Sequence, residues 1–303
     1  MGSNSIVIRV DGGICSQIAT VSMGLRLEEK FAGQADVKYD LSWYRDCGTD
    51  MNGRFVRNWD FPKAFPGIVC REASAEEAAR ESRRHPSQGL DIEAFRPPVY
   101  VRGYPDRYPN LCAQAARLKK AFAPKTDAAT DRWLDVIARG RTCAVHVRRG
   151  DLAAFSPAYG NPASVEYFQK AVAIIRGLEP DVRFLFFSDE LDWVRDVLLP
   201  SLPSGIDATP VDGHGSENGY LDLYLISKCD YIISSAGSFG VFGAVLSDSC
   251  KALVMNRNRT YAFRFLKNVI YINDSYREEG LPPSSRRGFL RRLFGGGAKG
   301  VGR

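Results

Sequence analysis

The stretch "TCAVHVRRGD", residues 142–151, decides the fold that the sequence predicts. Its first six residues are apolar at nearly every position, which is typical of a central strand of a parallel sheet with both faces covered. Arg148 and Arg149 follow at the strand's carboxyl end, the edge of an open parallel sheet that faces the ligand crevice. A guanidinium pairs bidentately with phosphate oxygens. The six residues "HVRRGD" therefore indicate either an anion site or a strand that simply ends in salt-bridged charges.

Strands and helices are expected to alternate after this stretch. In chain order we expect a helix over 164–177, a strand in "VRFLFFSD", a helix in "ELDWVRDVLL" closed by Pro200, a helix in "NGYLDLYLISKC", a strand in "DYIISSAG", a short helix in "SFGVFGAVLS" and a strand in "KALVMN". Such alternation predicts right-handed βαβ units and an α/β fold with a parallel sheet.

The amino-terminal part begins in the same way. "IVIRV" predicts a strand, "DGGICSQ" a glycine turn and "IATVSMGLRLEEKF" a helix, and a further helix is expected over 127–139. From Asp40 to about Pro124 the periodicity is weak. An irregular domain surface, long loops and an acceptor site all fit this segment.

Composition narrows the class of protein. A chain of 303 residues usually forms two domains. Its longest apolar run, "AGSFGVFGAVL", has 11 residues, fewer than the ~20 of a membrane span. The chain start lacks the layout of a secretory signal. Seven cysteines without a C-x-x-C pair, and three histidines, assemble no zinc pattern. We therefore expect a protein of the reducing cytoplasm with no metal site.

The net charge of +6 comes from the carboxyl-terminal tail. Six basic residues and no acidic ones lie within 284–303, and the rest of the chain carries equal numbers of each sign. The net charge therefore gives no indication of a nucleic-acid surface on the rest of the chain, and we expect no nucleic acid as a partner. In the tail, "RRGFLRRLF" would place four apolar side chains on one helical face, which suits an anionic membrane surface. A disordered tail ending in glycines fits equally well.

Three further segments could carry chemistry. In "ISSAGSFG" a strand leads through serines and glycine into a helix, which predicts a phosphate cradle with Ser235 and Ser238, although Ser238 could be a plain N-cap. "DGGICSQ" matches neither a P-loop nor G-x-G-x-x-G. In "FSDE", Ser188 and Asp189 follow a strand, where an aspartate is usually a helix cap. No D-x-D pair occurs, so a departing diphosphate would need arginine and helix termini rather than a divalent ion.

Taken in order, these segments resemble a known family. "HVRRGD", the "GG-x-x-x-Q" turn, "FFSDELDWV" and "DLYLISKCDYIISSAGSFGVFGAVLS" are similar to the bacterial α-1,2-fucosyltransferases, from about Ile6 to Asn256. The resemblance implies a GT-B-like fold with two facing Rossmann-type domains, using GDP-fucose with no cofactor or metal. It divides the chain into an acceptor-side domain (1–140), a GDP-sugar-binding domain (141–275) and the basic tail (276–303).

The resemblance also implies the site residues. Arg148 would contact the donor diphosphate and be needed for activity, with Arg149 assisting, and His146 would be a strand residue beneath the site. The other donor-binding positions are Asp151, Ser188, Asp189, Asp222, Ser235, Ser238 and Phe239, and the first loop facing the donor holds Gly12, Gly13 and Gln17. The chain departs from the family pattern at two places, with Cys15 and Ser16 in the first loop and Gly240, Val241 and Phe242 after the serines.

The expected activity is inverting, metal-independent transfer of L-fucose from GDP-fucose to a glycan hydroxyl, most simply in α-1,2 linkage. The nearest carboxylate for a general base is Asp11. A transferase for another GDP-sugar and a catalytically silent nucleotide-sugar or glycan-binding module are the alternatives. The acceptor could be lipid-linked. The tail would then touch the inner face of the membrane through its arginines, Arg286, Arg287, Arg291 and Arg292.

Overall fold

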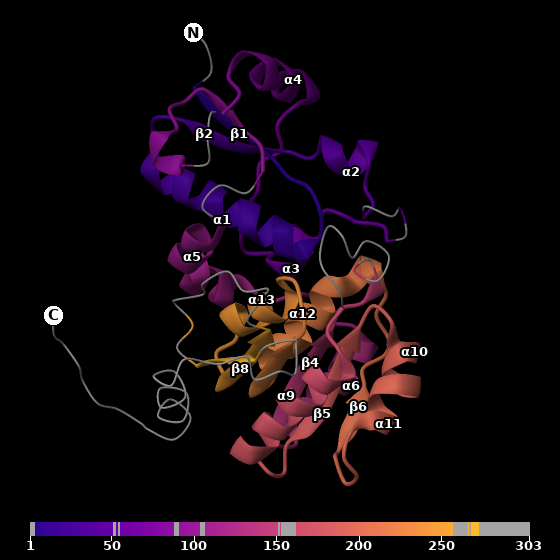
Figure 1. The fold of residues 1–303 in the computed structure, drawn as a ribbon. Coiled ribbons are helices and arrows are strands. Elements are labelled where there is room, and N and C mark those ends of the chain that lie inside the picture. Colours follow the sequence, from indigo (N-terminus) through magenta and orange to yellow (C-terminus); the bar gives the residue numbers. More distant parts are fainter. Residues whose placement is uncertain are drawn as a thin grey trace, which may run out of the picture.

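The computed structural model describes residues 4–50, 53, 55–87, 91–103, 107–150, 152, 162–256, 266 and 268–272. Two parallel sheets form the frame of the molecule, one from each half of the chain. Figure 1 shows the amino-terminal sheet above the carboxyl-terminal one, with helices α3, α12 and α13 between them. The order of strands and helices confirms the predicted α/β class.

The amino-terminal sheet has three strands in the order β2-β1-β3, all parallel. They are β1 (Ser5–Arg9), β2 (Asp36–Asp40) and β3 (Val99–Val101). Ile6, Val7 and Ile8 of β1 are fully buried, as expected of a strand with a neighbour on each side. Helix α1 (Ile14–Lys30) follows the predicted glycine turn and connects β1 to β2.

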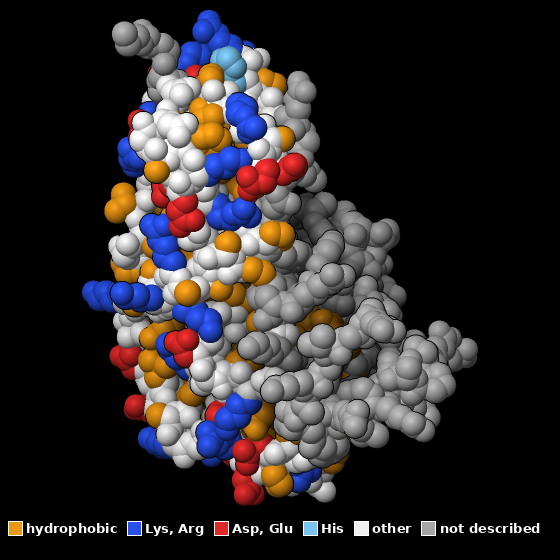
Figure 2. Space-filling model, turned by 90° about the vertical axis from the view of Figure 1, so that its left-hand side faces the viewer, with side chains coloured by type: hydrophobic (Ala, Val, Ile, Leu, Met, Phe, Trp, Pro, Cys, Tyr) orange, Lys and Arg blue, Asp and Glu red, His pale blue; other side chains and the backbone are white. Residues whose placement is uncertain are grey.

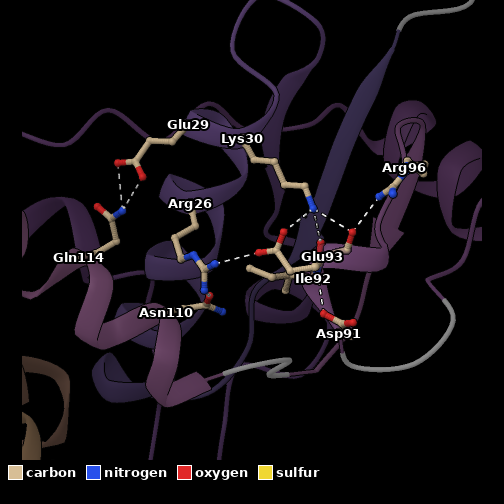
Figure 3. Close-up of polar contacts among 9 residues, drawn as sticks. All are labelled: Arg26, Glu29, Lys30, Asp91, Ile92, Glu93, Arg96, Asn110 and Gln114. Carbon is tan, nitrogen blue, oxygen red and sulfur yellow. Dashed lines mark hydrogen bonds and ion pairs between the residues drawn. The ribbon is translucent and has the colours of Figure 1, made fainter. Parts of the chain in front are cut away.

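The segment of weak periodicity folds into short pieces around this sheet. They are α2 (Ser42–Asp46), α3 (Phe61–Ala64), α4 (Ala75–Arg84), η1 (Ile92–Ala94), β3 and α5 (Arg107–Ala121). Figure 3 shows how α1 is tied to η1 and α5: Arg26 donates to Asn110 Oδ1 and Glu93 Oε1, both at 2.9 Å, and Gln114 donates to Glu29. These charge-assisted contacts fix the helix that begins at the first glycine loop.

The carboxyl-terminal sheet has six parallel strands in the order β6-β5-β4-β7-β8-β9. They are β4 (Thr142–Val147), β5 (Arg183–Ser188), β6 (Ala208–Pro210), β7 (Tyr231–Ser234), β8 (Ala252–Asn256) and β9 (Val269–Ile272). All six residues of β4 are buried. The first six residues of the quoted stretch are therefore a central strand, as predicted.

The helices of this half largely confirm the predictions. They are α6 (Ala128–Ala138), α9 (Val165–Leu178), α10 (Leu191–Trp193), α11 (Leu199–Ser201), α12 (Gly219–Lys228) and α13 (Phe239–Leu246), with the 3-10 turn η3 (Ser216–Asn218). The prediction that Pro200 closes a helix was wrong. A π-helical turn (Val194–Leu198), in which the Leu199 N–H donates five residues back to Val194 O, precedes the proline, and the chain stays helical to Ser201.

The boundary at residue 140 separates the two sheets, but the hydrophobic cores cross it. Trp133 and Ile137 of α6 pack in the core of the carboxyl-terminal sheet. Conversely, Tyr220 of α12 and Phe242 of α13 pack in the same core as Phe65 of the amino-terminal half. Burial of these shared side chains joins the two halves.

On the face drawn in Figure 2, basic and acidic side chains are interspersed among apolar and neutral ones. This mixture agrees with the balanced charge that the sequence gives to residues before the tail.

Candidate functional site

The strand order of the carboxyl-terminal sheet reverses between β4 and β7. From β4 the chain moves outward to β5 and β6, then returns to the other side of β4 for β7, β8 and β9. This is the Rossmann order, and in such sheets ligands bind beyond the carboxyl ends of the strands at the reversal. His146–Arg148 and Ser234–Ser238 lie at this place, and His146 pairs with Ser234 in the sheet.

Arg148 is held at the reversal by the serine loop. Its amide N–H donates to Ser235 Oγ at 3.0 Å, and the Ser235 amide donates to His146 O at 3.1 Å. Gly237 has φ +72°, and its vacant Cβ position lies 3.4 Å from an Arg148 guanidinium nitrogen. The guanidinium therefore lies against the turn that leads from β7 into α13.

His146 lies in the strand beneath this arginine. It is buried, and its ring stacks on Phe239 with 5.2 Å between the ring centroids. Burial, reinforced by the positive charge of Arg148, lowers its pKa to about 3. A neutral imidazole with this pKa has little capacity to accept a proton near pH 7. The geometry gives His146 a packing role.

Arg149 points elsewhere. Its guanidinium carbon lies 3.8 Å from the centroid of the Trp193 ring, and its Nε lies 3.4 Å from Glu190 Oε2. The Arg149 backbone amide donates to Asp189 Oδ1 at 2.9 Å, so the Asp189 carboxylate anchors the backbone at this position. The two motif arginines, which follow the end of β4, point in different directions. Arg149 holds the β5–α10 segment in place.

Gln17, which was predicted to lie in the first loop, lies instead in the first turn of α1, and its role is mainly structural. Gln17 is fully buried, its amide donates to Asn58 O at 2.7 Å, and its Oε1 accepts from the backbone of Asp60 and Phe61. It thereby fixes the segment before α3. Gly12 has φ +73°, which favours glycine, and Gly13 is the N-cap of α1. Asp11 lies just before them, partly exposed, after the end of β1.

Sequence reasoning missed two residues near this loop. Arg57 Nη1 lies 3.6 Å from the vacant Cβ position of Gly13, and the Arg57 guanidinium sits over the Phe55 ring. Phe55 Cε2 lies 3.3 Å from the vacant Cβ position of Gly150, directly after the motif arginines. This close approach brings the first half of the chain beside Gly150, which follows the motif arginines. The local sequence around Phe55 and Arg57 carried no signal, because the contact bridges residues about 95 positions apart.

Asp222 is bound to a histidine rather than open to solvent. His214 Nδ1 lies 2.6 Å from Asp222 Oδ1, and His214 Nε2 lies 3.1 Å from Thr130 Oγ1. The Thr130 hydroxyl donates to Asp127, so it must accept from His214. With Asp222 ionised, its Oδ1 accepts from Nδ1, so both ring nitrogens are donors, as they are in the imidazolium. The hydrogen bond to Asp222 raises the pKa of His214 accordingly, while burial raises the pKa of Asp222.

Residues 131–279 match the family described as Glycosyl transferase family 11. This half of the chain belongs to that family. The resemblance expected from the "HVRRGD" and serine-loop segments is thereby confirmed, and the chain is a divergent member, with 21–31% identity to its curated relatives. The matched residues include the whole six-stranded sheet, so the site at the β4–β7 reversal lies inside the family 11 domain.

Relatives of the chain carry fucosyltransferase names. A galactoside 2-alpha-L-fucosyltransferase from Bos taurus is 21% identical over 71% of this chain and 48% of its own length. The O-antigen biosynthesis glycosyltransferase WbnK from Escherichia coli is 23% identical over 40% of this chain and 39% of its own. The chain spans about half or less of the length of these curated relatives.

A solved structure has the same fold. The NodZ alpha-1,6-fucosyltransferase co-crystallised with GDP covers 86% of this chain and 97% of its own, with a TM-score of 0.52 and 14% identity. The chain has the GT-B fold, with two domains built on parallel sheets.

The remaining predicted positions occupy the carboxyl edge of the family 11 domain or lie outside the described residues. Ser188 Oγ accepts from the Glu190 amide, Ser238 is the N-cap of α13 without a side-chain capping bond, and Phe239 stacks on His146. Asp151 and the whole tail, including its four arginines, are outside the described residues. The structure thus brings the serine loop and Arg148 together, and the membrane contact expected of the tail stays a prediction.

The described part of the chain holds neither a cluster of metal ligands nor a membrane-spanning helix. No group of three or more metal-ligating side chains comes together there, and no helix among those residues is long and apolar enough to cross a bilayer.

Gly240 allows α13 of the family 11 domain to sit close to β7. A Cβ at this position would lie 2.7 Å from both Cβ and Oγ of Ser234 and 3.3 Å from its Cα. We expect Gly240→Ala to push α13 away from the strand and to lower the free energy of unfolding by about 1–3 kcal/mol. Gly177→Ala is the matched control, because no atom lies within 4 Å of that vacant position in α9. Urea unfolding that ranks the two variants equally would contradict the close approach.

The His214 imidazolium predicts a pH dependence of stability. The folded protein holds this proton more tightly than the unfolded chain, so the stabilisation is complete below pH ~6.5. It is lost as the pH rises through the raised pKa of His214. We expect the wild type to lose stability relative to His214→Asn in urea unfolding between pH 6 and pH 9. His85, whose side chain is 40% exposed, provides the control variant His85→Asn, and equal pH slopes for all three proteins would contradict the ion pair.

Proposed function

We propose that the chain is an inverting, metal-independent fucosyltransferase that moves L-fucose from GDP-fucose to a glycan hydroxyl in α-1,2 linkage. The observation that carries the proposal is the position of Arg148 at the β4–β7 reversal of a family 11 domain, anchored through Ser235 and lying against Gly237. The α-1,2-fucosyltransferase names of several curated relatives support the linkage.

In the proposed reaction, an acceptor hydroxyl oxygen attacks the anomeric carbon of β-linked fucose from the face opposite to GDP. The new C–O bond forms as the bond to the phosphate oxygen breaks, so the configuration inverts to α. The departing GDP gains negative charge, which a fixed guanidinium at Arg148 would stabilise. The hydroxyl proton must pass to a base, and we propose Asp11, which follows β1 in the first loop.

The test is a set of assays on the wild type. We expect GDP release from GDP-fucose, faster with a β-galactoside acceptor, and linkage analysis of the product should give α-1,2-fucose. Faster turnover of GDP-mannose would instead indicate another GDP-sugar. Nucleotide binding without GDP release, in the presence of a broad acceptor panel, would indicate a silent binding module.

Asp11 is tested by Asp11→Asn, which keeps the size of the side chain and removes its basicity. We expect a loss of about 10²-fold or more in kcat with little change in GDP affinity. A kcat within a few-fold of the wild type would assign proton removal to another group.

A further inference from the structure

Arg57 lies beside the first glycine loop and forms no ion pair with any residue that the structure describes. Within the residues that the structure describes, no carboxylate lies at ion-pair distance from it, and its contact is the face of the Phe55 ring at 5.7 Å. The positive charge of Arg57 offsets a small part of the rise that burial causes in the pKa of Asp60. The Asp60 carboxylate itself is paired with Lys63 Nζ at 3.0 Å. The Arg57 side chain is partly exposed, so solvent or a ligand can reach it.

The position of Arg57 follows from two close contacts. Its Nη1 lies 3.6 Å from the vacant Cβ position of Gly13, where α1 begins. The ring beneath it, that of Phe55, approaches Gly150, with Cε2 3.3 Å from the vacant Cβ position of that glycine. Arg57 is therefore a residue of the amino-terminal domain that lies where the first loop and the family 11 domain meet.

The family 11 domain itself presents only one of its two motif arginines. Arg149 is paired with Glu190 and stacked on Trp193, and its side chain is 20% exposed, so it cannot turn toward a ligand without breaking both contacts. A donor diphosphate bears more negative charge than the single guanidinium of Arg148 can balance. An unpaired cation on the opposite domain would complete the charge balance.

We propose that Arg57 is a second binding residue for the donor diphosphate, supplied by the amino-terminal domain opposite Arg148. This inference rests on the proposed function. It assigns to Arg57 the assisting role that the family resemblance implied for Arg149.

The test compares the affinities for GDP and GMP by titration calorimetry. We expect Arg57→Ala and Arg57→Gln each to weaken GDP binding by about tenfold or more, the range for losing a hydrogen bond to a charged group. GMP binding should change much less, because GMP lacks the terminal phosphate. Arg57→Gln retains most of the side-chain stem, so it serves where the alanine variant does not fold.

Arg45→Ala is the matched control. Arg45 belongs to the same domain, but its Nη1 is paired with Glu72 at 2.8 Å on the surface, so GDP affinity should stay at the wild-type value. GDP affinity within twofold of the wild type in both Arg57 variants, or equal losses for GDP and GMP, would overturn the inference and leave the proposed function intact. A wild-type protein that binds no GDP would overturn the proposed function and this inference together.

Discussion

Arg148→Ala is expected to lower kcat for the proposed transfer by about 10²- to 10³-fold at saturating donor, the range for removing one fixed electrostatic stabiliser from an active site. The backbone of Arg148 is anchored through its own amide to Ser235, so truncating the side chain leaves the strand end in place. The free energy of unfolding should therefore change little. The expected defect lies in the chemical step, because the charge on the departing GDP grows as the bond breaks.

The control for this variant is Arg183→Ala. Arg183 begins β5, at the end of the sheet opposite to the site, and its Nε pairs with Asp207 Oδ2 at 2.7 Å. The substitution Arg183→Ala removes the same charge from the same domain, and we expect kcat to stay near the wild-type value. The kcat of Arg148→Lys should fall between those of Arg148→Ala and the wild type, because an ammonium group keeps the positive charge but lacks the planar fork of the guanidinium. Near-normal turnover in a folded Arg148→Ala protein would exclude the arginine from the mechanism.

The central strands were predictable and the edge strands were not. Strands β4, β5 and β8 are apolar at most positions, because helices cover both faces of a parallel sheet. Strand β6 (Ala208–Pro210) is a three-residue edge strand that is only half-buried and ends in proline. Three residues are too few to display a period, so its existence depends on pairing with β5 rather than on its own sequence.

The site was predictable only as far as it is local. Arg148 and the serine loop could be found because each follows a recognisable strand. The sequence could not show that Arg149 turns to Glu190 and Trp193, since that choice depends on the path of the chain after β5. Gln17 was expected to face the donor, but its buried amide is occupied by the backbone at 58–61.

A row of aromatic rings connects the two halves of the molecule. Phe61 and Phe65 stack at 4.6 Å between centroids, Phe65 stacks on Phe122 at 4.9 Å, and Phe122 meets Tyr224 of α12 edge-on at 5.2 Å. Phe65 is fully buried in the middle of this row. We expect Phe65→Ala to lower the free energy of unfolding by about 3–5 kcal/mol, because it removes a large apolar group and leaves a cavity lined by the other rings.

The control for Phe65→Ala is Val69→Ala. Val69 is four residues away and 81% exposed, so we expect its substitution to change the free energy of unfolding by no more than about 0.5 kcal/mol. Because α12 carries both Tyr224 and Asp222, the loss at Phe65 should also reach the family 11 domain. Tryptophan fluorescence and GDP binding should then decay at the same urea concentration in Phe65→Ala, at a lower midpoint than in the wild type. An unchanged GDP-binding midpoint, with fluorescence alone shifted, would mean that the two halves fold independently and that the ring row does not couple them.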